Sequence, residues 1–191
     1  MTVGSQLHAT SVDSVHVDER RGVAMAVEHL VSLGHRDICH VDGGRAVLSQ
    51  TRRESYLDSM AEHGLADRVR IIGGNADENS GVAAATELLA GTSLPTAVLA
   101  YNDMTAFGLP FALRIRGIDV PGDVSVVGYD DTRLATLRNV ELTSVSQDPA
   151  EQAATAVQRA IARAEGQAAP ASEFVTPPRL VVRQSSGRAP R

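Results

Sequence analysis

The sequence has little of several things that mark particular classes of protein. Aromatic residues make up only 3% of the 191 residues, and tryptophan is absent. Proteins that bind single-stranded nucleic acid stack the bases on several aromatic side chains, so this class is excluded. The formal net charge is −5, which offers no basic face to DNA phosphates. We therefore expect any contact with DNA to be made by another segment.

Cysteine and long apolar runs are scarce as well. The single cysteine, Cys39, lies in the apolar run DICHV, so no internal disulfide can form and a buried, inert thiol is expected. No stretch approaches the roughly 18 apolar residues of a membrane span. The N-terminal residues lack the basic start and long apolar core of a secretory signal. The sequence thus predicts a cytoplasmic protein without a membrane partner.

Short apolar runs and helical patterns alternate along most of the chain. Strands are expected at SVHV, DICHV, RVRII, PTAVLA and DVSVVG, with a helical pattern between each run and the next. The order β-α-β-α-β-α-β-α-β is typical of an α/β fold with a parallel sheet and helices on both faces. Strands that are apolar throughout fit this class, because both faces of such a sheet are covered.

The alternation ends after Asp131. An extended piece, LTSVSQ, comes next, and a long helix follows in which Asp148 is the expected N-cap and Pro149 the first helical residue. PPRLVVRQS is a last expected strand, and the tail from residue 186 is expected to be frayed.

Polar side chains follow three of the predicted strands, where ligands bind in open parallel sheets. They are residues 42–44 (DGG), Asn102 with Asp103, and Asp130 with Asp131. Short polar side chains at these places also cap the helices that follow. Because neighbouring side chains leaving a strand point in opposite directions, we expect Asp103 and Asp131 to cap while Asn102 and Asp130 face the crevice.

The patterns for catalysis and metal binding are weak. Adjacent aspartates make a poor acid–base pair, and a metal site would need more converging carboxylates. The histidines lack a zinc-binding spacing, and no G-x-S-x-G elbow or phosphate-binding P-loop occurs. We therefore expect no catalytic residues, no metal and no cofactor, hence no enzyme. Arg52 and Arg53 are either a solvated pair, or one of them reaches the cleft as a hydrogen-bond donor.

Four stretches, taken together and in order, resemble the effector-binding domain of LacI/GalR-type transcriptional repressors. They are VEHLVSLGHRDI (27–38), NDMTAFG (102–108), GIDVPGDVSVVGYDD (117–131) and LTSVSQ (142–147). The resemblance covers residues 14–185. It implies a periplasmic-binding-protein-like fold, in which two α/β lobes flank a cleft.

The resemblance also implies domain boundaries. Residues 1–17 would be a remnant of the first lobe, 18–147 the second lobe, 148–176 a helix returning to the first lobe, and 177–191 a final strand and tail. The helix-turn-helix headpiece and most of the first lobe would be absent, so the chain is expected to be N-terminally truncated. Operator DNA would be bound only through that absent headpiece, and a homodimer is expected.

The family's effector contacts carry over to Arg52, Asn102, Asp130 and Gln147. The implied effector is a small molecule, sugar or nucleoside-like. Arg52 belongs to an R-x-x-G-[YF] motif whose glycine is replaced here by Ser55, and the preceding loop is one residue short, so Arg53 is the alternative to Arg52. A stand-alone sugar-binding module and a non-functional truncated remnant are the other interpretations.

Overall fold

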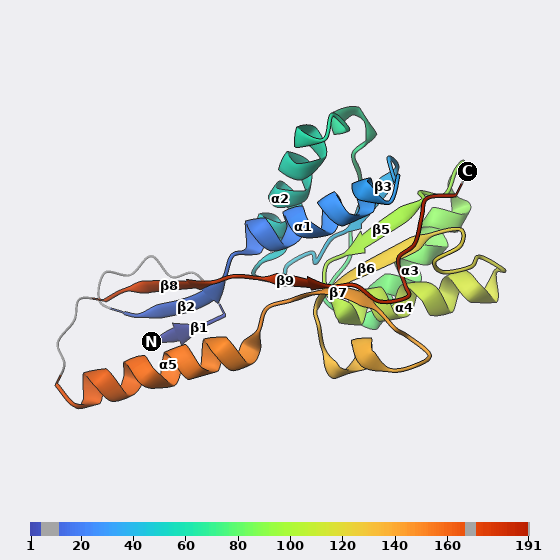
Figure 1. Ribbon diagram of the computed structural model, residues 1–191. Coiled ribbons are helices and arrows are strands. Elements are labelled where there is room, and N and C mark those ends of the chain that lie inside the picture. Colours follow the sequence, from blue (N-terminus) through green and yellow to red (C-terminus); the bar gives the residue numbers. More distant parts are fainter. Residues whose placement is uncertain (5–11, 167–170, 191) are drawn as a thin grey trace.

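The larger sheet is built from the short apolar runs that the sequence predicts as strands (Figure 1). The computed structural model describes residues 1–4, 12–166 and 171–190, and orders this sheet β4-β3-β5-β6-β7-β9. Its strands are β3 (Ile38–Val41), β4 (Arg70–Ile72), β5 (Ala97–Ala100), β6 (Ser125–Asp130), β7 (Thr143–Ser146) and β9 (Arg179–Val181). Neighbours run parallel except β7 and β9, which are antiparallel. The predicted α/β class is confirmed.

Two pairs of helices cover the two faces of the larger sheet (Figure 1). They are α1 (Glu19–Ser32) with α2 (Ser49–Glu62), and α3 (Glu78–Ala90) with α4 (Asp103–Ile115). Along β5, Ala97 and Leu99 pack among residues of α1 and α2, whereas Val98 and Ala100 pack among residues of α3 and α4. The strand β5 is thus buried on both faces, which explains its apolar sequence.

A smaller parallel sheet lies beside the larger one, in the order β1-β2-β8 (Figure 1). It consists of β1 (Thr2–Val3), β2 (Ser14–Val17) and β8 (Glu173–Thr176), and α5 (Pro149–Ala164) runs along it. The start of α5 is as predicted, because the Asp148 carboxylate accepts a hydrogen bond from Glu151 N at 3.3 Å and Pro149 is the first helical residue.

Three connections join the two sheets: β2 to α1, β7 to α5, and β8 to β9 (Figure 1). Because β7 leads directly into α5, the carboxyl edge of the larger sheet faces the smaller one. Two described 3₁₀ turns lie in loops of the larger sheet: η1 (Ala66–Arg68) precedes β4, and η2 (Arg133–Thr136) lies between β6 and β7. Residues 5–11 and 167–170, which belong to the predicted first-lobe segments, are outside the described residues.

The C-terminal tail packs against the larger sheet and α1, so the prediction of a frayed tail was wrong for residues 186–190. Ala189 N donates to Leu33 O at 3.0 Å, and the Gly187 carbonyl lies 3.0 Å from His35 Nε2. The tail supplies partners for polar groups at the end of α1 and for the buried His35 ring, which a free tail would leave unsatisfied. Residue 191 lies outside the described residues.

Candidate functional site

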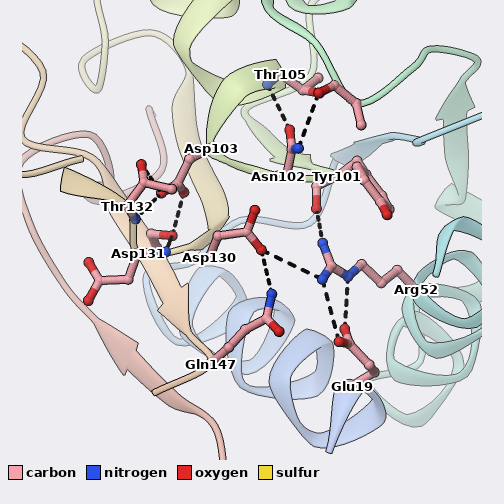
Figure 2. Close-up of polar contacts among 12 residues, drawn as sticks. Glu19, Arg52, Tyr101, Asn102, Asp103, Thr105, Asp130, Asp131, Thr132 and Gln147 are labelled. Atoms are coloured by element: carbon pink, nitrogen blue, oxygen red, sulfur yellow. Dashed lines mark hydrogen bonds and ion pairs between the residues drawn. The ribbon is translucent and has the colours of Figure 1, made fainter. Parts of the chain in front are cut away.

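Polar side chains gather at the carboxyl edge of the larger sheet, where the sequence places its candidate ligand contacts (Figure 2). Asn102 follows β5, Asp130 ends β6, and Gln147 follows β7. The β6–β7 register pairs Asp130 with Ser146, which brings the Gln147 side chain next to the Asp130 carboxylate. Parallel pairing therefore assembles residues that are 45 positions apart in sequence at one edge.

Arg52 lies at the centre of this edge with its side chain almost fully buried. Its Nε donates to Glu19 Oε2 at 2.8 Å, and its Nη1 donates to the Tyr101 carbonyl at 2.6 Å (Figure 2). The guanidinium carbon also lies 4.7 Å from the ring centroid of Tyr101 and 3.7 Å from that of Tyr129. Burial works against the charge, yet the ion pair with Glu19 holds the pKa of Arg52 above its usual value.

Asp130 is more accessible than Glu19, the other carboxylate near Arg52, because about a third of the Asp130 side chain is exposed. Its Oδ1 accepts a hydrogen bond from Gln147 Nε2 at 2.5 Å and lies 3.8 Å from Arg52 Nη2 (Figure 2). Burial raises the pKa of Asp130 to about 6, and the nearby Arg52 opposes that rise. Asp130 and Asp131 have φ values of 112° and 50°, in the positive-φ region that side-chain-bearing residues adopt rarely.

Asn102 caps the helix that was expected to be capped by its neighbour, so this prediction was wrong. The Asn102 Oδ1 accepts from Thr105 N at 2.9 Å, and its Nδ2 donates to the Ala76 carbonyl at 3.3 Å (Figure 2). Asp103 is one residue too late to cap, because it is already the first residue of α4. Asn102 thus uses most of its hydrogen-bonding capacity inside the fold and is only 9% exposed.

The carboxylates of Asp103 and Asp131 hold the backbone around the edge in place. Asp103 is buried and accepts from Thr132 N at 2.6 Å and Ser144 Oγ at 2.5 Å. Asp131 accepts from Arg183 Nη2 at 2.6 Å and caps no helix, contrary to the expectation. Asp131 has a φ of 50°, and its carboxylate contacts Arg183 in the segment after β9.

The two arginines at the start of α2 differ in their surroundings. Arg53 is about half exposed and pairs with the buried Asp42, whose Oδ1 also accepts from Gly44 N at 2.5 Å. Arg52, one residue earlier, is the arginine beside Asp130. Of the alternatives left open by the sequence, the solvated pair is therefore excluded, and Arg52 is the arginine that lies with the other candidate residues.

Sequence reasoning missed Glu19 and the two tyrosines that enclose Arg52. Glu19 is the first residue of α1 and is 9% exposed. The Tyr129 ring reaches Arg52 because Gly22 on α1 leaves room for it, since a Cβ there would lie 2.3 Å from the tyrosine hydroxyl. Glu19 and Arg52 are 33 positions apart, so only the packing of α1 against α2 reveals this pair. The one sequence signal for Glu19 was that its carboxylate directly follows Asp18, the N-cap of α1.

A hollow of about 470 Å³ lies next to this cluster, between the smaller sheet and the start of α2. It is lined by His16, Val17, Glu19, Leu48, Thr51 and Val175, among others. Glu19 therefore belongs both to the Arg52 cluster and to the wall of the hollow.

Within the described residues, no group of three or more histidine, cysteine, aspartate or glutamate side chains is arranged to hold a metal ion. Burial raises the pKa of the Cys39 thiol to about 12, as expected of an inert core cysteine. In the same part of the chain, no helix has the length and apolarity needed to cross a membrane.

Comparisons with known proteins bear directly on this arrangement. The periplasmic binding protein-like domain matches residues 27–186. The solved structure of a LacI transcriptional regulator from a Rhodococcus species superposes with a TM-score of 0.94 and 39% identity, over 99% of this chain and 70% of that one. This chain belongs to the LacI/GalR family.

Other members of the LacI/GalR family show how much of a regulator the chain represents. The HTH-type transcriptional regulator GalR of Escherichia coli is 35% identical over 173 residues, which are 90% of this chain and 50% of GalR. The chain spans about half the length of the curated relatives it matches. These relatives are named as transcriptional regulators, in agreement with the non-enzymatic interpretation.

Two further LacI-family structures contain bound ligands. A LacI family regulator from Enterococcus faecium, solved with bound ribose, is 26% identical with a TM-score of 0.86, over 97% of this chain and 69% of that one. The lac repressor dimer bound to operator and the anti-inducer ONPF is 28% identical with a TM-score of 0.85, over 97% and 64%. The predicted periplasmic-binding-protein-like fold and LacI/GalR resemblance are both confirmed.

Proposed function

We propose that this chain is the effector-sensing part of a LacI/GalR-type regulator and that the effector is a neutral polyol such as a sugar. The observation that carries the proposal is the Asp130 carboxylate, partly exposed beside the Arg52 guanidinium and the Gln147 amide. A carboxylate accepts hydrogen bonds and a guanidinium or amide donates them, so the set suits neighbouring hydroxyl groups. The ribose-bound relative supports a sugar.

The four proposed contacts contribute unequally. Asp130 and Gln147 offer the acceptor and amide, and Arg52 offers its Nη2 edge. Asn102 contributes through its remaining Nδ2 hydrogen, because its other groups are bonded within the fold. We therefore rank Asp130 first and Asn102 last in their effect on binding.

The effector would act by changing how the two sheets sit relative to each other. We propose that residues 18–147 form one lobe and that residues 1–17 and 148–176 belong to the other. Residues 177–191 return to the lobe formed by residues 18–147. A ligand that binds one relative orientation better than another shifts the population towards it. Operator contact, in the cytoplasm, is assigned to a separate DNA-binding segment, because a net charge of −5 does not favour DNA phosphates.

Titration calorimetry with ribose tests the proposal, followed by other neutral monosaccharides. Replacing Asp130 with Asn removes the charged acceptor, and we expect at least about a tenfold weaker binding. Asp67→Asn, an exposed aspartate on η1, is the control and should bind as the unaltered chain does. Chemical conversion of the sugar, or equal binding by Asp130→Asn, would contradict the proposal.

We also propose that two copies of the chain associate through the outer face of α3 and α4. Phe111 and Ile115 are each 67% exposed there, beside an apolar hollow of about 620 Å³ lined by Val82, Phe107 and Pro110. Large exposed apolar side chains in one patch mark an association surface. The lac repressor relative is a dimer, which makes a second copy the partner to test first.

Light scattering during size-exclusion chromatography measures this association. The unaltered chain should have the mass of a dimer, and Phe111→Glu should shift it to about 20.2 kDa, the mass of one chain. Val182→Glu places the same charge at another exposed apolar position and should leave the dimer intact. A monomeric unaltered chain would exclude this interface.

A further inference from the structure

Two carboxylates compete for one buried guanidinium at the candidate site. Glu19 Oε2 is 2.8 Å from Arg52 Nε and Glu19 Oε1 is 3.5 Å from Arg52 Nη2, whereas Asp130 Oδ1 is 3.8 Å from the same Nη2 (Figure 2). Glu19 therefore makes a two-point contact, and Asp130 makes only a longer one. The more accessible of the two carboxylates, Asp130, is the one that Arg52 contacts at the longer distance.

The position of Arg52 is fixed from several sides. Glu19 and the Tyr101 carbonyl take its Nε and Nη1 groups, and the rings of Tyr101 and Tyr129 lie within 5 Å of the guanidinium carbon. A buried guanidinium needs a carboxylate partner, because an unpaired buried charge is strongly destabilising. With Glu19 present, that requirement is met without Asp130.

The arrangement leaves Asp130 with unused hydrogen-bonding capacity. Its Oδ1 accepts from Gln147, and its Oδ2 has no partner within the part of the chain that the structure describes. If Glu19 were neutral, Asp130 would be the nearest carboxylate to Arg52, and a shift of about 1 Å would close a full ion pair. An arginine–carboxylate pair of that kind occupies both carboxylate oxygens.

We propose that Glu19 is a positioning residue that holds Arg52 away from Asp130 and so keeps the Asp130 carboxylate open to the effector. That an effector meets this carboxylate rests on the function proposed above, whereas the positioning of Arg52 concerns only this chain. Glu19, Arg52 and Asp130 also carry a combined charge of −1, so the site should favour a neutral polyol over its phosphate ester.

The test follows the Asp130 carboxyl carbon by NMR as the pH is changed. The charged groups that face Asp130 are Arg52 on α2, Glu19 on α1 and Asp103 on α4. Burial keeps the pKa of Asp130 raised, at about 6. In the Glu19→Gln variant, Arg52 should move onto Asp130. The pKa of Asp130 should then fall by about one unit or more. No ligand is needed for this measurement.

Two controls separate positioning from a general loss of charge. Asp18→Asn removes one charge at the neighbouring position, where Asn can still cap α1 through its side-chain oxygen, and should leave the pKa of Asp130 almost unchanged. In an Arg52→Gln background, Glu19→Gln should shift that pKa much less than in the unaltered chain. Equal shifts in both backgrounds, or no shift in either, would overturn the proposal.

If Glu19→Gln does not fold, Glu19→Asp gives a second route. It keeps the charge but shortens the side chain by one methylene, so it should lower the pKa of Asp130 by an intermediate amount. An unchanged pKa in that folded variant would also refute the proposal. Failure to bind ribose while these shifts occur would reject the proposed function alone, so the two ideas can fail separately.

Discussion

At the scale of the single residue, the charged Asp130 carboxylate is proposed to bind the effector but lowers the stability of the fold. Burial raises its pKa to about 6, so between about pH 4 and pH 6 the folded chain binds a proton that the unfolded chain has lost. Stability therefore falls as the pH rises through this window. Asp130→Asn should be more stable than the unaltered chain at pH 7.5, on the order of 1 kcal/mol after allowance for partial exposure, and similar to it near pH 4.

Urea unfolding at pH 4 and pH 7.5 checks this expectation, with the neighbouring residue as the control. Asp131 forms a partly buried ion pair with Arg183 at 2.6 Å, so Asp131→Asn should lose about 2 kcal/mol at pH 7.5. Two adjacent aspartates are thus expected to respond to the same substitution with opposite signs. A destabilised Asp130→Asn at pH 7.5 would show that its carboxylate holds the fold together.

The sequence was a good guide to where polar residues gather and a poor guide to what each one does. Asn102 and Asp103 were assigned to the correct edge, but Asn102 is the N-cap in place of Asp103, because α4 begins one residue earlier than the capping argument assumed. Helix ends are uncertain by a residue or so, and one residue decides which side chain caps. Glu19 was missed because its partner lies in another helix.

At the scale of the element, the contact between α3 and α4 depends on two glycines. A Cβ on Gly81 would lie 2.1 Å from the Thr105 carbonyl, and a Cβ on Gly108 would lie 2.1 Å from the Glu78 carbonyl. The glycine in the NDMTAFG motif is therefore required by helix packing. Helix-to-backbone contact of this kind cannot yield as a flexible side chain can.

Gly108→Ala should accordingly destabilise the fold by about 3 kcal/mol, because α3 and α4 must move apart. Thermal and urea unfolding would measure the loss. Gly73→Ala is the matched control, since a Cβ there meets nothing within 4 Å, and it should change stability by no more than about 0.5 kcal/mol. Equal stability of the two variants would mean that the helices adjust without strain.

Elements were predicted well where the sequence marks both their pattern and their ends. The core strands are the predicted apolar runs, and α1, α3 and α4 each end within two residues of a glycine, a common helix-ending residue. The C-terminal tail was mispredicted because its sequence is polar and contains glycine and proline. Its order comes from hydrogen bonds to Leu33 and Ser125, which are distant in sequence.

At the scale of the whole molecule, the two sheets differ in how they are held. Both large clusters of buried apolar side chains in the described residues belong to the six-stranded sheet and its helices. The smaller sheet relies on Asp13, which is fully buried and accepts from Arg163 Nε at 2.6 Å and Ser172 N at 2.9 Å. Hydrogen bonds from Arg163 are the main cause of a pKa of Asp13 well below its usual range.

Asp13→Asn should therefore loosen the smaller sheet without unfolding the larger one. Amide hydrogen exchange would show faster exchange in β2, β8 and α5, while β3, β5 and β6 stay protected. Acid should have the same selective effect in the unaltered chain, because a carboxylate with a lowered pKa contributes stability that is lost as the pH falls below about 4. Asp67→Asn should change neither region. Uniform loss of protection over both sheets would mean that they unfold as one unit, and that relative motion of the lobes needs no independent opening of the smaller sheet.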